Sequence, residues 1–475
     1  MAMGRKRDRQ QNLWIAADEL PRNRGHIFYD WLKTILNGAG FDEFAERECV
    51  GFYKSETMGR PSIAPGVYFR MLLIGYFEGI DSERGIAWRC ADSLSLKSFL
   101  GYGLTETTPD HSTISRTRRL IDIETHGRIF TWMLQVLANH GLVDGKTIGV
   151  DATTLEANAA MRSIVRRDTG ESYSEFLTRL AQASGIETPT QEDLAKLDRK
   201  RRNKGSNQEW EHPDDPDAKI TKMKDGRTHL AHKVEHAVDM ETGAVLAVTL
   251  QDANAGDTTT IRQTLIAVAE QMETLTEDVE TAPHVAPNWL SEIVTDKGYH
   301  SNETLVDLNE FEIRSYISEP NRGRRNWIGK EAERDAVYNN RRRIRGERGK
   351  RLLRQRGLML ERPFAHCYET GEMRRVHLRG QENILKRLLI HVAGFNLSLV
   401  LRLMIGKGTP RGLQDLAIVY FLTLIELTRQ LGWAVEAETR FAHPKVFNPS
   451  ITGCQSPTAE SLLLPRAVRS SCANN

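Results

Sequence analysis

Two aspartates follow short apolar runs of the kind that form buried strands, and their positions could support metal chemistry. Asp151 follows the run TIGV at 147–150, and Asp296 follows IVT at 293–295. Ligand sites in α/β domains form where strands end, because the chain leaves the packed core there. Two neighbouring carboxylates repel each other unless a cation neutralises them, and such hard oxygen ligands suit Mg²⁺. A plainer alternative stays open: Asp296 begins a turn before Gly298, and Asp151 caps the next segment.

A third acid, Glu361, lies in a segment of unusual charge. An apolar stripe of Leu352, Leu353 and Leu360 precedes it and could dock a helix against a sheet. The window 322–362 holds 15 Lys or Arg against 5 Asp or Glu, whereas the whole chain has 65 against 63. Such charge density beside a carboxylate site is typical of proteins that bind phosphate backbones. A solvated basic face is the alternative reading of the same charges.

The elements that must position these acids begin near residue 146, where the pattern changes from helical to strand-like. Short apolar or alternating runs bounded by turn residues predict strands. The predicted strands cover residues 147–150, 230–239, 244–250, 293–295 and 313–317. The turn residues at 241–243 join the second and third of these strands into a β-hairpin. The polar stretch 162–227 resembles an insertion or connecting arm rather than core, and residues 385–403 predict an apolar amphipathic helix.

The first 140 residues or so are predicted to be helical, because apolar residues recur there at spacings of three and four. Pro109 breaks one segment, and Asp110 or Ser112 can cap the helix that comes next. The result resembles a helix-turn-helix whose last helix carries three arginines. These are Arg116, Arg118 and Arg119. A plain helical hairpin with a solvated basic face is the alternative.

Composition narrows the class of protein. Hydrophobic residues make up 40% of the 475 residues and charged residues 27%, with a mean hydropathy of −0.46, as is usual for a soluble globular chain. The uncharged apolar window at 416–425 is about half of the roughly 20 residues that span a bilayer. The basic N-terminus has no apolar stretch behind it, so no secretory signal is predicted. The five cysteines never form a CxxC pair, which argues against a disulfide framework or a cysteine zinc site.

Taken in order, these residues resemble the DDE transposases encoded by bacterial insertion sequences. The resemblance covers roughly residues 25 to 405 and keeps the family's order of motifs. Each motif alone is weak, but the ordered set is specific. The matching pieces are SER at 82–84, PDHSTISR at 109–116, GVDAT around Asp151, TDKGY around Asp296, and LERPFAH around Glu361, followed by GEMRR at 371–375 and LRG at 378–380.

The resemblance implies an α/β fold in which an all-helical DNA-binding domain precedes an RNase H-like mixed sheet with flanking helices. We expect the helical domain over residues 1–140 and the catalytic domain over 141–405. The catalytic domain would carry a polar insertion at about 162–227 and a basic insertion at about 320–350. Residues 406–475 would form a C-terminal helix, predicted over 413–431, and a poorly ordered tail.

The implied activity is metal-dependent cleavage and strand transfer of double-stranded DNA, at the terminal inverted repeats of the element and at its target. Asp151, Asp296 and Glu361 would be catalytic and would hold two Mg²⁺ ions, for which Mn²⁺ can substitute. A homodimer is expected, because two element ends must be joined, in the cytoplasm and without a membrane partner. The residues expected to contact DNA are Arg116, Arg118, Arg119, Arg341, Arg342, Arg343, Arg354 and Arg356.

The sequence departs from the family around its glutamate. Many relatives place a Tyr, an Arg and a Lys at fixed offsets there, whereas this chain has Gly357 four residues before Glu361 and Tyr368 seven after it. Arg354 or Arg356 would then take over phosphate binding. Pro363 also suits the first turn of a new helix better than a helix middle. For these reasons Glu369 and Glu372 are alternative third acids.

Two rival functions stay open. The segment HKVEH at 232–236 fits the HxxEH signature of inverted zinc proteases. That chemistry requires a helix, but the segment alternates like a strand and runs into a hairpin turn. We therefore expect His232 and His236 to be half-buried, hydrogen-bonded strand residues with Lys233 and Glu235 on the other face. The second rival is a catalytically inactive DNA-binding or regulatory relative, against which the presence of all three acids argues.

Overall fold

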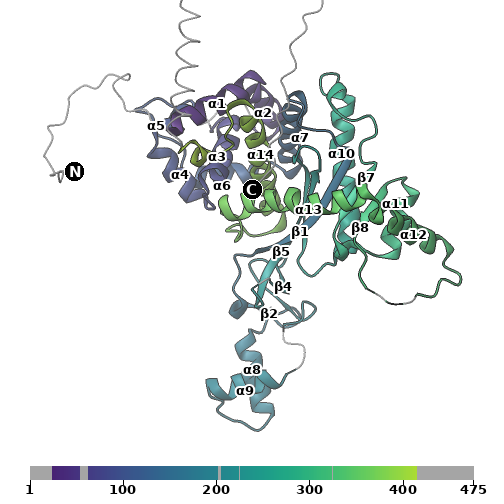
Figure 1. The fold of residues 1–475 in the computed structure, drawn as a ribbon. Helices are drawn as coiled ribbons and strands as arrows, with labels where there is room; N and C mark the ends of the chain where they lie inside the picture. Colours follow the sequence, from purple (N-terminus) through teal and green to yellow (C-terminus); the bar gives the residue numbers. More distant parts are fainter. Residues whose placement is uncertain are drawn as a thin grey trace, which may run out of the picture. The chain divides into compact units, whose positions relative to one another are not determined.

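The computed structural model describes residues 24–53, 62–201, 205–223, 225–321, 323 and 325–414. The basic N-terminal stretch lies outside these ranges, as does the tail. Nearly all of the helix predicted over 413–431 also lies outside the described residues. The described chain consists of helices before a sheet, the sheet itself, and the helices that cover it (Figure 1).

Helices make up the described chain before the sheet, as the spacing of apolar residues predicts. They are α1 (Arg24–Gly38), α2 (Phe41–Cys49), α3 (Pro65–Glu78), α4 (Glu83–Ala91), α5 (Leu94–Leu100), α6 (His111–Leu120) and α7 (Ile123–Asn139). Four of them begin at a polar cap whose side chain accepts a hydrogen bond from the backbone N–H three residues on. These caps are Ser82, Ser93, Asp110 and Asp122. The predicted helix start at Asp110 is thus confirmed.

The main sheet is mixed, as expected for an RNase H-like fold. Its strands are β1 (Thr147–Glu156), β4 (Lys219–Lys222), β5 (Thr228–Asp239), β6 (Val245–Asp252), β7 (Glu292–Thr295) and β8 (Arg314–Ile317). β5 pairs antiparallel with β1, β4 and β6, which confirms the predicted hairpin of β5 and β6. β7 lies parallel to β1 and β8 parallel to β7. The path across the sheet therefore runs β5, β1, β7, β8, with β4 and β6 on the far side of β5.

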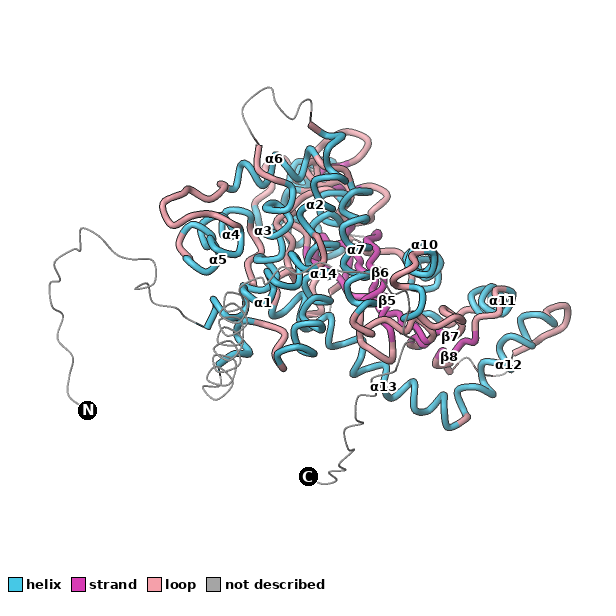
Figure 2. The backbone as a smooth tube through the Cα atoms, turned by 90° about the horizontal axis from the view of Figure 1, so that it is seen from above, coloured by secondary structure: helices cyan, strands magenta, loops and turns pink. Residues whose placement is uncertain are grey.

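Helices lie on both faces of this sheet. Figure 2 shows the strands between α10 (Asp257–Glu277) and α13 (Glu347–Phe364). Gly149 lets α13 come close, because a Cβ at that position would lie 3.1 Å from a methyl group of Leu360. Covering both faces buries both alternating sets of side chains in β5, from Leu230 to its end. Any polar residue in that stretch must therefore find its partners inside the protein.

A buried asparagine pairs with one backbone position on each of two outer strands of the sheet, β6 and β8. At β6, Asn396 accepts a hydrogen bond from the backbone N–H of Val245 and donates one to its C=O, at 2.9 and 2.8 Å. At β8, Asn340 makes the same two bonds with Ile317, at 3.0 and 2.8 Å. Asn396 belongs to α14 (Gln381–Ile405) and Asn340 to α12 (Glu331–Arg345). Backbone groups that an edge strand would leave unpaired are thereby satisfied.

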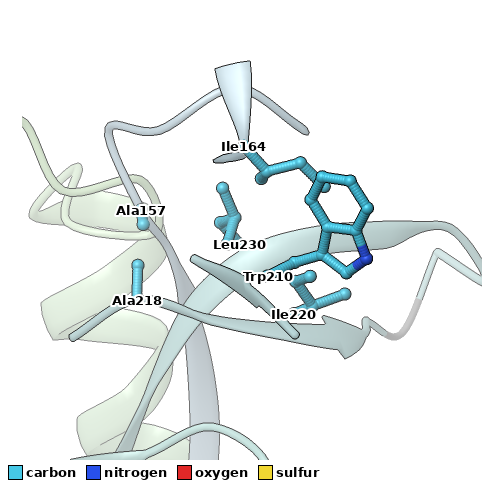
Figure 3. Close-up of a cluster of buried hydrophobic side chains, with 6 residues drawn as sticks. All are labelled: Ala157, Ile164, Trp210, Ala218, Ile220 and Leu230. Carbon is cyan, nitrogen blue, oxygen red and sulfur yellow. The ribbon is translucent and has the colours of Figure 1, made fainter. Parts of the chain in front are cut away.

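The stretch predicted as a polar insertion is more structured than expected. It contains β2 (Val165–Arg166), α8 (Tyr173–Ala183), α9 (Gln191–Lys200) and β3 (Trp210–Glu211), and its β4 joins the main sheet. Figure 3 shows its small apolar core around Trp210, which is only 1% exposed. The core residues are Ala157, Ile164, Trp210, Ala218, Ile220 and Leu230. The stretch thus has a small core of its own, to which the buried Trp210 contributes the largest side chain.

The basic region forms two consecutive helices. α12 is followed directly by α13, and α13 by a π-helical segment, η6 (Ala365–Thr370). Pro363 lies inside α13, close to its end, so the expectation that it opens a new helix was wrong. The missing N–H of this proline removes one helical hydrogen bond. The widened π turn after it absorbs the irregularity.

α14 is the long apolar helix predicted at 385–403. It packs against α3 and α7 on one side and against β6 on the other. The helix is long and apolar enough to cross a membrane, but 78% of its most apolar stretch is buried inside the protein. We therefore assign it as a core helix that ties the N-terminal helices to the sheet.

Candidate active site

Asp151 lies in the middle of β1 rather than at its end. The strand continues through five more residues to Glu156, so the expectation that Asp151 ends a short strand was wrong. Asp151 still projects from the face that α13 covers, where Arg356 reaches it. Its side chain is one-quarter exposed, which leaves it open to a ligand from solvent.

Asp296 directly follows β7, as predicted. It caps η5 (Lys297–Tyr299) by accepting a hydrogen bond from the N–H of Gly298 at 2.8 Å. In the parallel pairing of β1 and β7, Gly149 lies opposite Val294. Extending that register by two residues places Asp151 opposite Asp296. The two strands therefore bring the first two predicted acids side by side.

The charges around Asp151 show how close the two acids are. Burial raises the pKa of Asp151 above its ordinary value, and the negative charge of Asp296 raises it further. The backbone N–H of Ala152 and the guanidinium of Arg356 act in the opposite direction. Arg356 Nη1 donates to Asp151 Oδ2 at 2.9 Å. A cation thus already neutralises part of this carboxylate pair.

The pair fits a hard divalent cation. Its donors are carboxylate oxygens, the ligands that Mg²⁺ prefers. Burial raises the pKa of Asp151 and the charge of Asp296 adds to it, and a bound cation would offset both effects. Within the described residues, however, no group of three or more His, Cys, Asp or Glu side chains is arranged to hold a metal.

Glu361 does not join the pair in this structure. It is exposed, on the outer face of α13, near Leu358, which is 71% exposed. Arg356, which meets Asp151, lies five residues earlier, and five residues correspond to about 140° beyond one full helical turn. The two side chains therefore leave the helix in nearly opposite directions. Of the three predicted acids, the structure brings together two.

The alternative acids are placed differently. Glu369, in η6, accepts from Arg374 Nη2 at 2.6 Å, and that arginine also donates to Thr153 Oγ1 at 2.9 Å. Thr153 is two residues beyond Asp151 on the same face of β1, so Arg374 is a cation near the site that was not predicted from the sequence. The GEMRR motif contained it, but nothing in that motif marked which arginine turns inward. Glu372 is exposed and has a positive φ of 59°.

Tyr368, one of the two positions at which the sequence departs from the family that it resembles, is fully buried. Its hydroxyl lies 2.6 Å from His236 Nε2. His236 is directly opposite Asp151 in the pairing of β5 with β1. Burial holds the pKa of Tyr368 well above its usual range, so the residue stays neutral. It supports the strand beside Asp151 but cannot supply the positive charge of a lysine.

The zinc-protease alternative does not fit the structure. His232 and His236 are both in β5, where four residues span roughly 13 Å. Their Nε2 atoms have different partners, Asp215 Oδ2 at 3.3 Å and the hydroxyl of Tyr368. Both histidines are completely buried, more than the half-burial we expected. They cannot bind one zinc ion together.

The predicted DNA-contacting arginines fall into two groups. Arg116, Arg119, Arg342 and Arg354 are exposed. The others are less exposed, and each has a partner outside its own helix. Arg118 is 7% exposed and pairs with Glu83 at 2.8 Å. Arg341 pairs with Glu319 at 2.5 Å, and Arg356 pairs with Asp151. Arg343 is half-buried and donates a hydrogen bond to Ser315. In this structure the guanidinium of Arg118 is thus engaged inside the protein.

Two family models match the chain. A Transposase domain (DUF772) matches residues 17–120, and a Transposase DDE domain matches residues 187–397. Helices before a mixed sheet, with an acid pair on two adjacent parallel strands, fit a transposase of the DDE class. The chain belongs to the insertion-sequence DDE transposases. A comparison with curated proteins gives no significant match.

The DDE match contains Asp296 and Glu361 but begins after Asp151. The structure nevertheless places β1, with Asp151, in the centre of the sheet that the matched residues build. The unmatched segment 121–186 thus contributes the central strand of the domain. The insertion after β1 separates that strand in sequence from the rest of the sheet.

Proposed function

We propose that this transposase binds the ends of its element, cuts the DNA there and joins the freed 3′-OH to target DNA. The observation that carries the proposal is the parallel pairing of β1 and β7, which sets Asp151 beside Asp296. Asp151, Asp296 and Glu361 would hold two Mg²⁺ ions, which Mn²⁺ can replace. Such ions would activate the attacking hydroxyl and stabilise the leaving oxygen.

The protein's own residues would position the DNA around that site. Arg356 neutralises Asp151 now, and on release it would be within reach of a phosphate at the same place. Arg374, near Thr153, provides a second cation on the same face of β1. Exchange of one phosphodiester bond for another needs positioning and charge neutralisation rather than an energy source. No cofactor besides metal is therefore proposed.

The exposed arginines suggest where DNA would lie. Arg342 and Arg354 point outward from α12 and α13, and Arg116 and Arg119 from α6. We assign the first pair to phosphates without sequence preference and the second pair to the element ends. The working form would be a homodimer, since two ends must be joined, acting in the cytoplasm on nucleoid DNA.

Glu361 is the third acid of the proposal. It lies on α13, the helix that already contacts Asp151 through Arg356. A rotation of the end of α13 would turn Glu361 toward the pair, and the π-helical η6 directly follows that end. Because π segments are often found at functional sites, the end of α13 is a reasonable place for such a rotation. Glu369 and Glu372 are the competing candidates.

Asp151→Asn, Asp296→Asn and Glu361→Gln should each abolish DNA cleavage and leave DNA binding nearly unchanged, because each removes a metal-binding charge without touching the basic surface. The measurement is nicking, with Mg²⁺ or Mn²⁺, of a duplex that carries the inverted repeats flanking the coding sequence. Binding of the same duplex is measured by fluorescence anisotropy.

Glu369→Gln and Glu372→Gln are the matched controls. If Glu361→Gln cleaves normally and one of these two does not, the third acid has been assigned wrongly. If the parent protein binds the duplex but never nicks it, under either metal, the inactive DNA-binding relative is the better description.

A further inference from the structure

A buried ion-pair network lies under the loop that carries Asp296, on the face of the sheet opposite Arg356. Lys233 is 4% exposed and Glu235 is 0% exposed. Both side chains project from β5 toward α10. Burying charges is costly unless each is paired and hydrogen-bonded, so the partners of these two residues show what the network holds.

The ammonium group of Lys233 donates three hydrogen bonds. Its Nζ donates to Asp257 Oδ1 at 2.7 Å, to Thr260 Oγ1 at 2.8 Å and to the backbone oxygen of Ala255 at 3.3 Å. It also lies 3.1 Å from Glu235 Oε1. One lysine thereby neutralises two carboxylates, one from the strand and one from the start of α10.

Glu235 connects this lysine to the Asp296 loop. It accepts hydrogen bonds from the hydroxyls of Thr260 and Thr264, and from the hydroxyl of Tyr299 at 3.2 Å. Tyr299 is three residues after Asp296 and ends η5. Burial raises the pKa of Tyr299, and the carboxylates of Glu235, Asp257 and Asp151 raise it further, so its hydroxyl keeps the proton that it donates.

Asp257 touches the same loop from the other side. A Cβ built on Gly298 would overlap Asp257 Oδ2 and would lie 3.0 Å from Asp296 Oδ1. Asp257 cannot easily move away, because its second oxygen is bonded to Lys233. The loop that carries Asp296 is therefore held between Tyr299, which Glu235 anchors, and Gly298, against which Asp257 packs.

We propose that Lys233, Glu235 and Asp257 are positioning residues that fix Asp296 relative to Asp151 for metal binding. The inference rests on the proposed metal site at those two aspartates. The lysine has a second effect, since without it four carboxylates would lie close together and repel one another. With it, Glu235 and Asp257 are occupied and Asp151 and Asp296 are left to face a cation.

The test measures binding of Mn²⁺ to the full chain without DNA, from the loss of the free-ion signal in electron paramagnetic resonance. Lys233→Met keeps the length of the side chain and removes its charge, and should weaken Mn²⁺ affinity about 10–100-fold, as is common when the partners of metal ligands are lost. Tyr299→Phe removes one hydroxyl only, and should give a smaller loss in a protein that folds normally. Gly298→Ala should also weaken binding, by crowding Asp257 against Asp296.

The matched control is Asp215→Asn, which breaks a pair with His232 on the same strand. Both of those side chains are 0% exposed, and they lie on the other face of β5. The variant should lose stability, monitored by thermal unfolding, yet keep the Mn²⁺ affinity of the parent. Equal losses of affinity in Asp215→Asn and Lys233→Met would show a merely structural role and overturn the inference.

Unchanged affinity in both Lys233→Met and Tyr299→Phe would also overturn it. A different result is expected if Asp151 and Asp296 do not bind metal at all. In that case Asp296→Asn, measured in the same series, would bind Mn²⁺ as well as the parent does. The two outcomes are therefore separated by one additional variant.

Discussion

Two cation–carboxylate pairs lie on opposite faces of the same sheet, and they differ in almost every physical respect. On the α10 face, Lys233 is 5% exposed in its side chain and has two carboxylates and two further acceptors. On the α13 face, Arg356 and Asp151 are 23% and 25% exposed and share one hydrogen bond. The first pair cannot exchange partners without opening the core, whereas the second can.

The difference shows how one sheet can combine rigidity with access. A fixed network holds the backbone that carries Asp296, and a partly exposed pair with Arg356 neutralises Asp151. Partly exposed ion pairs contribute less to stability than fully buried ones, so losing the Arg356–Asp151 pair should cost the fold less than losing the Lys233 network. Variants on the two faces, and on the outer surface of the helices, should therefore differ in the size of their effects.

The largest expected effect is on stability. Lys233→Met should lower the free energy of unfolding by about 3–5 kcal/mol, because it leaves Glu235 buried without its counter-ion. Arg356→Gln should lower it by less, because both side chains of that pair reach solvent. Urea denaturation followed by circular dichroism measures both. Similar losses of unfolding free energy in the two variants would show that the ion pairs on the two faces do not differ in their contribution to stability.

The second effect is on stability in acid. Two buried histidines on the α13 side of the sheet should make the free energy of unfolding fall as the pH falls. Burial lowers the pKa of His236 and of His391 to about 3, and both contact η6, through Tyr368 and the backbone oxygen of Cys367. In the unfolded chain their pKa is about 6.5. The unfolded state therefore takes up protons first as the pH falls. Stability should be complete above about pH 6.5 and fall below it by about 1.4 kcal/mol per pH unit for each histidine.

Urea denaturation at several values between pH 7 and pH 5 measures this slope. His236→Gln should remove one histidine's share of it, after allowance for the lower starting stability. A stability that stays flat over this range in the parent would mean that the folded and unfolded proteins take up equal numbers of protons, so that the pKa values of these histidines are not lowered by folding.

The smallest effect concerns the outer surface of α12 and α13. Replacing the exposed Arg342, Arg351 and Arg354 by Ala should reduce the salt dependence of DNA binding by a slope of about 0.9 for each lost phosphate contact. Arg341→Ala is the control, because that side chain is already paired with Glu319 and should matter less. Binding to element ends and to random duplex is measured between 50 and 200 mM salt. A selective loss of end binding would place sequence readout on these helices.

Much of the sheet could be predicted from alternation and turn residues. The strand before Asp296 and the hairpin at 241–243 follow from local sequence, and so does the helix that begins at Asp110. The extension of β1 beyond Asp151 was missed because the segment DATTLE is polar. Its threonines favour strands, and pairing with β5 over nine residue pairs from Ile148 to Glu156 holds them there.

Other features depend on tertiary contacts that no local pattern contains. Lys233 and Glu235 alternate like surface residues, and only the position of α10 buries them. Arg118 has the sequence context of a DNA-binding residue beside Arg119, but Glu83 and Asn383, which is 265 residues away in sequence, draw it inward. The placement of Glu361 on the outer face of α13 likewise follows from the packing of its neighbour Leu360 against Gly149 of β1.

The asparagines that pair with β6 and β8 limit how copies of this protein can assemble. A strand from another chain could pair only with free backbone groups, and Asn396 and Asn340 already occupy those of Val245 and Ile317. Neither β-augmentation nor edge-to-edge aggregation is open at these positions. A second copy of the chain could therefore not add a strand across Val245 or Ile317 without first displacing these asparagines.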